Sequence, residues 1–312
     1  MTPPVVAPAN LPDLVRAAFA RARAAGDLTF FPTQVALLRV HGVPFQLRFA
    51  PALAHKPKAP RPSGGGGRPA DTTNPFANPP PGLVVLPQLG PSHRLLLNKF
   101  AVCPDHAILA TTAVRPQHHL LDAADLAAAY ACIEAYHAAA ADDPSGGGHN
   151  SDDDDDGLFI FYNSGPHSGA SQPHRHLQLL PVARMREGLP AADAAAWGVL
   201  ADRLTGEDEA TDDLPLCEQG RVPARISYNL AITHRTMALC PRVAERAPVV
   251  VPGSSSSSSP AGSVSPNGTL LAGTALVKTE AEWDALRSDP DQLARILQQV
   301  GVSASPRPEA AS

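Results

Sequence analysis

The segment from Gly165 to Gln178 reads G-P-H-S-G-A-S-Q-P-H-R-H-L-Q, and it ends in two histidines and a glutamine spaced two residues apart. Side chains alternate between the two faces of a strand, so a strand that begins at Pro173 or His174 places His174, His176 and Gln178 on one face. The residues before this trio are small or carry hydroxyl and amide groups, which suits a loop that binds phosphate. They are Asn163, Ser164, Gly165, Ser168, Gly169, Ser171 and Gln172.

Apolar runs on both sides of this loop predict a strand–loop–strand unit, with strands at Leu158–Tyr162 and His176–Pro181. Further strands are predicted at Val35–Val40, Phe45–Phe49, Leu83–Leu86, Arg94–Phe100, Ala107–Thr112, Ile226–Thr233, Thr236–Cys240 and Leu270–Val277. The first two of these form a hairpin candidate at His41–Gly42. Helices are predicted at Leu11–Ala25, from a cap at Asp122 to about Ala140, at Ala191–Leu204 and within Glu280–Val300. Strands grouped between helices favour an α+β fold with an antiparallel β-sheet and flanking helices.

The pattern restarts after Pro181, which predicts an N-terminal domain over residues 1–185 and a smaller C-terminal domain over 190–303 that completes it. Low-complexity stretches at 57–81, 142–156 and 252–266 are rich in Pro and Gly, in Asp, and in Ser. They contain few apolar residues to offset the entropy of ordering, so we expect surface loops there.

The composition excludes several functional classes. The chain has 312 residues, a net charge of −5 and a pI near 6.2, so nucleic acid is not an expected partner. No run of 18 apolar residues is present, so we expect no membrane span. The four cysteines are scattered, and the N-terminus lacks the pattern of a signal peptide. We therefore expect a cytoplasmic protein, with the nucleus as a second compartment, that is a monomer or a small homo-oligomer.

The aligned trio suits transfer of a phosphoryl or nucleotidyl group. A neutral imidazole has a free lone pair near physiological pH and can attack phosphorus, which splits one difficult step into two. His176, in the middle, is the candidate nucleophile, and His174 is a candidate to orient it or to donate a proton. Gln178 can hold an oxygen but cannot act as an acid. The loop Gly169–Gln172 supplies donors for the phosphoryl oxygens.

An H-x-H pair on a strand is also a common metal-binding pattern, and a zinc-binding structural protein remains an alternative. However, no third His, Asp or Glu follows at ligand spacing, and a metal site does not need the glycine- and serine-rich loop. We therefore predict no metal ligands among the site residues.

Several motifs resemble the diadenosine tetraphosphate (Ap4A) phosphorylases, or ATP adenylyltransferases, a branch of the histidine-triad superfamily. The most specific match is the block from Phe161 to Pro181, F-Y-N-S-G-P-H-S-G-A-S-Q-P-H-R-H-L-Q-L-L-P. Others are Asn74–Pro75–Phe76 with Asn78–Pro79, H-R-L-L-L-N-K-F from His93 to Phe100, S-Y-N-L from Ser227, and A-G-T-A-L-V-K from Ala272 to Lys278. The resemblance implies a histidine-triad-like fold and an adenylyltransferase role for both predicted domains.

The resemblance also implies the reaction. His176 attacks an α-phosphorus of Ap4A and expels ATP, and inorganic phosphate then takes the adenylyl group from the histidine to give ADP. The reaction is reversible, needs a divalent cation, usually Mg²⁺, and controls dinucleoside polyphosphate levels. In this family a glutamine at the position of Gln178 distinguishes transferases from hydrolases, which carry a third histidine. The implied substrate-binding residues are Lys56, Asn98, Lys99, Asn163, Ser164, Gly169, Ala170, Ser171, Gln172, Gln178 and Lys278.

Two further alternatives stay open at this point. Hexose-1-phosphate uridylyltransferases also carry two histidines and a glutamine, but they prefer H-P-H-P-Q, whereas Arg175 and Leu177 stand here. A non-catalytic nucleotide sensor would fit a chain that had lost the central histidine, and His176 is present.

Overall fold

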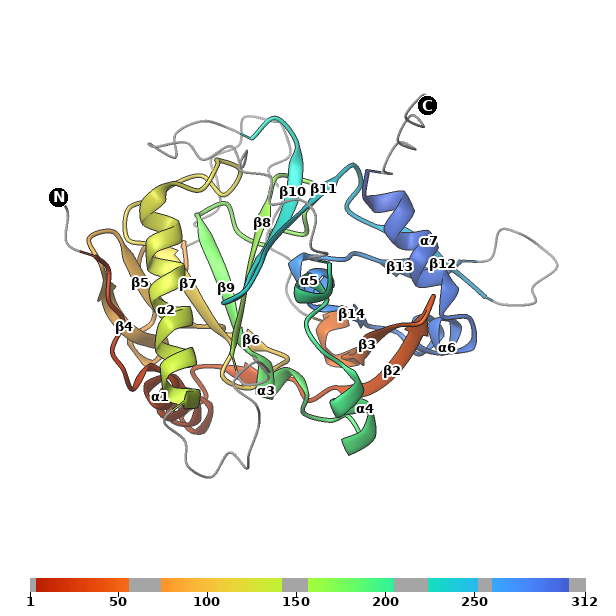
Figure 1. Ribbon diagram of the computed structural model, residues 1–312, viewed down its shortest axis with the longest axis horizontal. Coiled ribbons are helices and arrows are strands. Elements are labelled where there is room, and N and C mark those ends of the chain that lie inside the picture. Colours follow the sequence, from red (N-terminus) through yellow and green to blue (C-terminus); the bar gives the residue numbers. More distant parts are fainter. Residues whose placement is uncertain (1–3, 56–73, 142–156, 205–223, 252–259, 303–312) are drawn as a thin grey trace, which may run out of the picture.

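The computed structural model describes residues 4–55, 74–141, 157–204, 224–251 and 260–302. A seven-stranded antiparallel sheet in the order β11-β10-β8-β9-β7-β5-β4 organises this part of the chain (Figure 1). Its strands are β4 (Val84–Leu89), β5 (His93–Leu97), β7 (Ala107–Thr111), β8 (Leu158–Ser164), β9 (His176–Pro181), β10 (Ser227–Ile232) and β11 (Met237–Arg242). The predicted α+β class with an antiparallel sheet is confirmed.

Two helices form a core against one face of this sheet. Helix α1 (Leu11–Ala25) has the predicted bounds, and α2 (Ala123–Ala141) begins at the predicted cap, where Asp122 Oδ1 accepts hydrogen bonds from the backbone N–H groups of the second and third helical residues at 3.0 and 3.1 Å. Leu95, Leu109 and Leu177 lie opposite one another on β5, β7 and β9, and all are fully buried in the core that includes both helices.

A smaller three-stranded sheet lies at the other end of the molecule, together with the C-terminal helices (Figure 1). It contains β2 (Gln34–Val40) and β3 (Val43–Phe49), joined at His41–Gly42, and β14 (Thr274–Val277), which runs parallel to β3. Both turn residues have positive φ, 47° and 83°, as a two-residue hairpin requires. Further elements outside the two sheets are β1 (Thr29–Phe30), β6 (Phe100–Ala101), β12 (Ala247–Val250), β13 (Pro260–Val264), α3 (Val182–Met185), α6 (Glu280–Ser288), α7 (Asp291–Val300), η1 (Pro51–His55) and η2 (Pro81–Leu83).

Three predicted elements were wrong in part, for tertiary reasons. The helix predicted at 191–204 is broken into α4 (Ala191–Ala196) and α5 (Leu200–Arg203), because Trp197 between them adopts an extended conformation. Its indole is 2% exposed and donates to Gly273 O at 3.3 Å. The strand predicted at 270–277 begins as the 3-10 helix η3 (Gly268–Ala272), which ends at left-handed Gly273 before β14. The strand predicted at 94–100 stops at Leu97.

The expected surface loops had mixed outcomes. Residues 142–156 and most of 57–81 lie outside the described residues. At the end of the first stretch, however, residues 74–78 form an ordered turn in which Phe76 is 7% exposed, and in the third stretch residues 260–264 form β13, paired with β12. Cross-strand hydrogen bonds order that strand in spite of its composition.

The predicted division into domains 1–185 and 190–303 stays a prediction. Strands from both ranges share the large sheet, because β10 and β11 continue it from β8. Within the described ranges, no helix is both long and apolar enough to span a lipid bilayer.

Candidate active site

Sheet register places His176 and Gln178 on the face opposite the helices. His176 lies across from Ala110 on β7, which in turn lies across from Arg94 on β5. Residues directly opposite one another in a sheet share a face. Ile108, the partner of Gln178, and Ala110 belong to a small separate cluster that Phe76 covers. The alternation in H-R-H-L-Q therefore places the two histidines and Gln178 on the Phe76 face, and Arg175 and Leu177 on the side of the helices.

His176, the predicted nucleophile, is held as a neutral imidazole. Its Nδ1 lies 2.8 Å from the carbonyl oxygen of His174, which only accepts, so Nδ1 carries the proton and Nε2 keeps its lone pair. The side chain is 3% exposed, and its ring centroid lies 4.8 Å from that of Phe76. Burial lowers the pKa of His176 to about 4, although the hydrogen bond to His174 O acts in the opposite direction. The lone pair is thus available at neutral pH.

This buried neutral imidazole makes the free energy of unfolding depend on pH. The ordinary pKa of 6.5 falls to about 4 on folding, so between these values the unfolded chain binds a proton that the folded chain does not. The stabilisation is complete above pH 6.5 and is lost as the pH falls towards 4. We expect a loss of about 2 kcal/mol between pH 7 and pH 5 from this group. Urea unfolding at both pH values should show that loss in the wild type and in the control His118→Gln, which alters an exposed imidazole, but not in His176→Gln. Equal pH dependence in all three proteins would contradict the assignment.

His174 has both ring nitrogens engaged. Nε2 lies 2.9 Å from Thr111 O and therefore donates, and Nδ1 accepts from Asn74 Nδ2 at 3.0 Å. The orientation of the Asn74 amide is set because its Oδ1 accepts from the backbone N–H groups of Phe76 and Ala77 at 3.0 and 3.2 Å. His174 therefore connects the turn at 74–78 to the segment that leads into β9. This arrangement supports an orienting role for His174 rather than proton donation.

Gln117 holds the backbone of His176 in place, and no sequence pattern pointed to it. Strands β8 and β9 are paired only as far as Phe161 and Gln178, and beyond that point the buried Gln117 side chain joins them. Its Oε1 accepts from His176 N at 2.8 Å, and its Nε2 donates to His176 O at 3.0 Å and to Asn163 O at 2.9 Å. The amide thus takes the place of strand-to-strand hydrogen bonds where the two strands separate.

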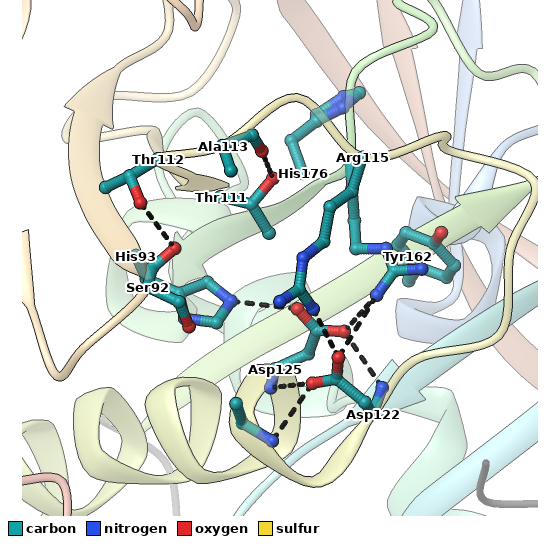
Figure 2. A network of polar contacts seen from close by, with 12 residues as sticks. Ser92, His93, Thr111, Thr112, Ala113, Arg115, Asp122, Asp125, Tyr162 and His176 are labelled. Carbon is teal, nitrogen blue, oxygen red and sulfur yellow. Dashed lines mark hydrogen bonds and ion pairs between the residues drawn. The ribbon is translucent and has the colours of Figure 1, made fainter. Parts of the chain in front are cut away.

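Arg175, between the two histidines, anchors the segment from the helix side, where Asp122 and Asp125 lie at the start of α2 (Figure 2). It is fully buried, and its Nη1 lies 2.7 Å from Asp125 Oδ2 and 3.7 Å from Asp122 Oδ2. The other carboxylate oxygen of Asp125 lies 2.8 Å from His93 Nε2. Burial works to raise the pKa of Asp125, but the hydrogen bond from His93 and the charge of Arg175 lower it overall. A charged network therefore holds the strand that carries His176.

The loop before the histidines has the backbone conformation of a tight turn. Gly165 and Gly169 have φ of 83° and 78°, a region that favours glycine, and Ser168 Oγ donates to Gly165 O at 2.7 Å. Ala170 and Ser171 are exposed, and Gln172 is partly buried. These three residues are accessible to a ligand, as the phosphate-loop prediction requires.

Asn163 and Ser164 are placed differently, because both are buried within β8. Asn163 Oδ1 accepts from Gly268 N and from Asn229 Nδ2, both at 2.8 Å, and Asn229 Nδ2 also donates to Ser168 O at 2.9 Å. The side-chain oxygen of Asn163 is therefore connected to the loop through Asn229, which also donates to Ser168 O.

The structure describes two of the three lysines that were predicted to bind substrate phosphates. Lys56 lies outside the described residues. Lys99 is exposed in the turn between β5 and β6, so the strand predicted over Arg94–Phe100 does not include it. Lys278 is exposed directly after β14, on the smaller sheet.

Asn98 and Gln178 lie within one chain of hydrogen bonds, linked by His106. His106 Nε2 is 3.0 Å from Gln178 Oε1, and Asn98 Nδ2 is 3.1 Å from His106 Nδ1. His106 was not among the predicted site residues, because a single histidine before a buried strand has no distinctive spacing. In the described part of the chain, no group of three or more His, Cys, Asp or Glu side chains is arranged to hold a metal.

Comparisons with known proteins identify the family of this chain. Residues 1–141 match the family model described as Ap4A phosphorylase N-terminal domain, and residues 173–303 match the ATP adenylyltransferase C-terminal domain. Diadenosine 5′,5‴-P1,P4-tetraphosphate phosphorylase 2 of Saccharomyces cerevisiae is 35% identical over 140 residues, which cover 44% of this chain and 39% of that protein. Protein APA1 of the same yeast is 30% identical over 181 residues, covering 56% of this chain and 50% of that protein. The aligned stretches thus span half or less of these curated relatives.

Solved structures match over nearly the whole chain. The yeast Ap4A phosphorylase Apa2 in complex with Ap4A is 25% identical with a TM-score of 0.68, covering 95% of this chain and 99% of that one. Apa2 in complex with AMP is 22% identical with a TM-score of 0.67, covering 96% and 98%, and shows the fold alone. With both domain models matched in order along the sequence, the chain belongs to the Ap4A phosphorylase family of ATP adenylyltransferases.

Proposed function

We propose that this protein catalyses the reversible phosphorolysis of Ap4A to ATP and ADP through a covalent adenylyl-histidine intermediate. The observation that carries the proposal is the buried, neutral His176, whose Nδ1 proton is committed to His174 O and whose Nε2 lone pair is free to attack. The match to an Ap4A phosphorylase solved with Ap4A supports the choice of a dinucleoside polyphosphate as substrate.

In the first step, Nε2 of His176 forms a bond to an α-phosphorus while the bond from that phosphorus to the bridging oxygen breaks. The electron pair leaves with ATP, whose terminal phosphate needs no proton to depart. In the second step an oxygen of inorganic phosphate attacks the same phosphorus, the N–P bond breaks, and ADP forms. The hydrogen bond to His174 O stabilises the positive charge that develops on the ring when Nε2 bonds to phosphorus.

Gln178 is proposed to favour phosphate over water in the second step. A histidine at this position could accept the proton that water loses, and a glutamine cannot. We therefore expect Gln178→His to raise the AMP-to-ADP product ratio by about 100-fold or more, in the range of general base catalysis. Product chromatography across a phosphate titration measures this ratio, and Gln88→His, a change in an exposed glutamine, is the matched control. A ratio equal to that of the wild type would contradict this role for Gln178.

The direct test of the function is product analysis with purified protein, Ap4A and Mg²⁺, with and without phosphate. Formation of ATP and ADP only when phosphate is present supports the proposal. Formation of ATP and AMP, or of two ADP, without phosphate would identify a hydrolase instead.

The cation is proposed to enter with the substrate. The described residues offer no cluster of ligands for it, and Mg²⁺ commonly binds substrate phosphates while keeping several waters. The proposed substrates are therefore Ap4A, ATP, ADP and phosphate, with Mg²⁺ on the phosphate chain. The proposed location, from the scattered cysteines, is the cytoplasm, and the oligomeric state stays a prediction.

A further inference from the structure

A chain of hydrogen bonds that begins at the backbone of β6 ends at Gln178. Phe100 N lies 3.0 Å from Asn98 Oδ1, and a backbone N–H can only donate. The Asn98 carbonyl oxygen is therefore the acceptor, and the Asn98 NH₂ group is directed towards His106. The orientation of this amide follows from a main-chain group and does not depend on the side chains beyond it.

The proton on His106 is placed by the same reasoning. Asn98 Nδ2, a donor, lies 3.1 Å from His106 Nδ1 and 3.3 Å from Nε2, while Nε2 lies 3.0 Å from Gln178 Oε1. A neutral imidazole carries one proton, so all three groups are satisfied when Nδ1 accepts from Asn98 and Nε2 donates to Gln178. The reverse tautomer would direct the Nδ1 proton at the Asn98 NH₂ group, so that two donors meet. His106 is 6% exposed, which makes an unmatched pair costly.

The direction of donation along these hydrogen bonds decides which end of the Gln178 amide faces the substrate. Because Oε1 accepts from His106, the NH₂ group is the end left for the open side of the sheet. His176 and Gln178 are neighbours on one face of β9, about 7 Å apart along the strand, so a phosphoryl group on Nε2 lies within reach of that NH₂.

We propose that His106 is a positioning residue that turns the Gln178 NH₂ group towards the reacting phosphorus and thereby selects phosphate over water as the acceptor. The inference rests on the proposed function and adds to it a residue that determines acceptor specificity. Asn98, expected to bind substrate, acts in this scheme by fixing the tautomer of His106.

The chemistry of the second step explains the selection. Inorganic phosphate approaches with an anionic oxygen that accepts a hydrogen bond from the NH₂ group, and the electron pair of the N–P bond returns to His176 Nε2. Water has to lose a proton as it attacks, and an NH₂ group offers no base to take it. If the Gln178 amide rotated, its carbonyl oxygen would repel phosphate and would accept a hydrogen bond from water.

The test compares two variants that differ in one hydrogen-bond donor. His106→Leu removes the donor to Gln178 Oε1, whereas His106→Gln can place an amide N–H near the position of Nε2. We expect the AMP-to-ADP ratio at fixed phosphate to rise about fivefold in His106→Leu, from the loss of one buried hydrogen bond, and to stay within about twofold of wild type in His106→Gln. His234→Gln, in the turn between β10 and β11, is the matched control. An unchanged ratio in His106→Leu, or an equal rise in both His106 variants, would overturn the proposal.

A second measurement stands apart from turnover and from the folding of any variant. In the wild-type protein labelled with ¹⁵N-histidine, the ring shifts of His106 should report a proton on Nε2; a proton on Nδ1 would overturn the proposal. Failure of the proposed function is separately visible, as a wild-type protein that makes no ADP in response to phosphate.

Discussion

His176→Ala is expected to lower kcat for phosphate-dependent formation of ATP and ADP from Ap4A by at least about 10⁴-fold, the scale on which loss of a covalent nucleophile acts. The reason is geometric. In the described structure His174, the nearest imidazole, uses both of its ring nitrogens for contacts to Thr111 and Asn74, so it cannot substitute as nucleophile. Turnover is measured by chromatography of the nucleotides. Retention of a tenth of the wild-type rate would remove His176 as the nucleophile.

The same position can be tested by supplying the missing group. His176→Gly leaves space for an imidazole ring, and adenosine 5′-phosphorimidazolide carries the P–N bond that the proposed intermediate contains. We expect this variant to convert the imidazolide and phosphate into ADP while remaining inactive on Ap4A. The opposite pattern, activity on Ap4A without conversion of the imidazolide, would place the covalent bond on another residue. The melting temperature of the variant, compared with the wild type, checks that the fold is retained.

Asp125→Ala is expected to have the largest effect on stability, lowering the free energy of unfolding by about 3 to 5 kcal/mol. Asp125 is fully buried, and its carboxylate is the partner of both Arg175 and His93. Without it, the buried guanidinium loses its nearer carboxylate, and Asp122 is more distant, at 3.7 Å. We also expect kcat to fall by about 100-fold, because Arg175 positions the strand that carries the nucleophile. Urea unfolding and steady-state kinetics measure the two effects.

The matched control is an acidic residue whose ion pair is exposed. Asp13 lies 2.9 Å from Arg16 on α1, and the two side chains are 71% and 59% exposed. Asp13→Ala should change the free energy of unfolding by no more than about 0.5 kcal/mol, because solvent screens such a pair. Similar losses in the two variants would show that the buried network contributes no more than a surface ion pair.

Local patterns in the sequence were sufficient for most of the elements and for the position of His176 on its strand. The spacing of apolar residues predicted α1 with its correct bounds, and the two turn residues His41–Gly42 predicted the first hairpin. The alternation in H-R-H-L-Q put His176 and Gln178 on one face, where the sheet register has them. These predictions succeeded because helix and strand periodicity depends on residues a few positions apart.

The sequence by itself therefore determined the fold class, the family and the central strand of the site, since each depends on contiguous residues. Only the tertiary structure decided what supports that strand. Asn74, His106, Gln117 and Asp125 lie between 50 and 100 positions away from the residues of the H-R-H-L-Q segment that they contact. The helix predicted at 191–204 is interrupted at Trp197, whose indole donates to Gly273 O, 76 positions along the chain. Such side-chain contacts leave no periodic signal, because they depend on which surfaces meet after the sheet has formed.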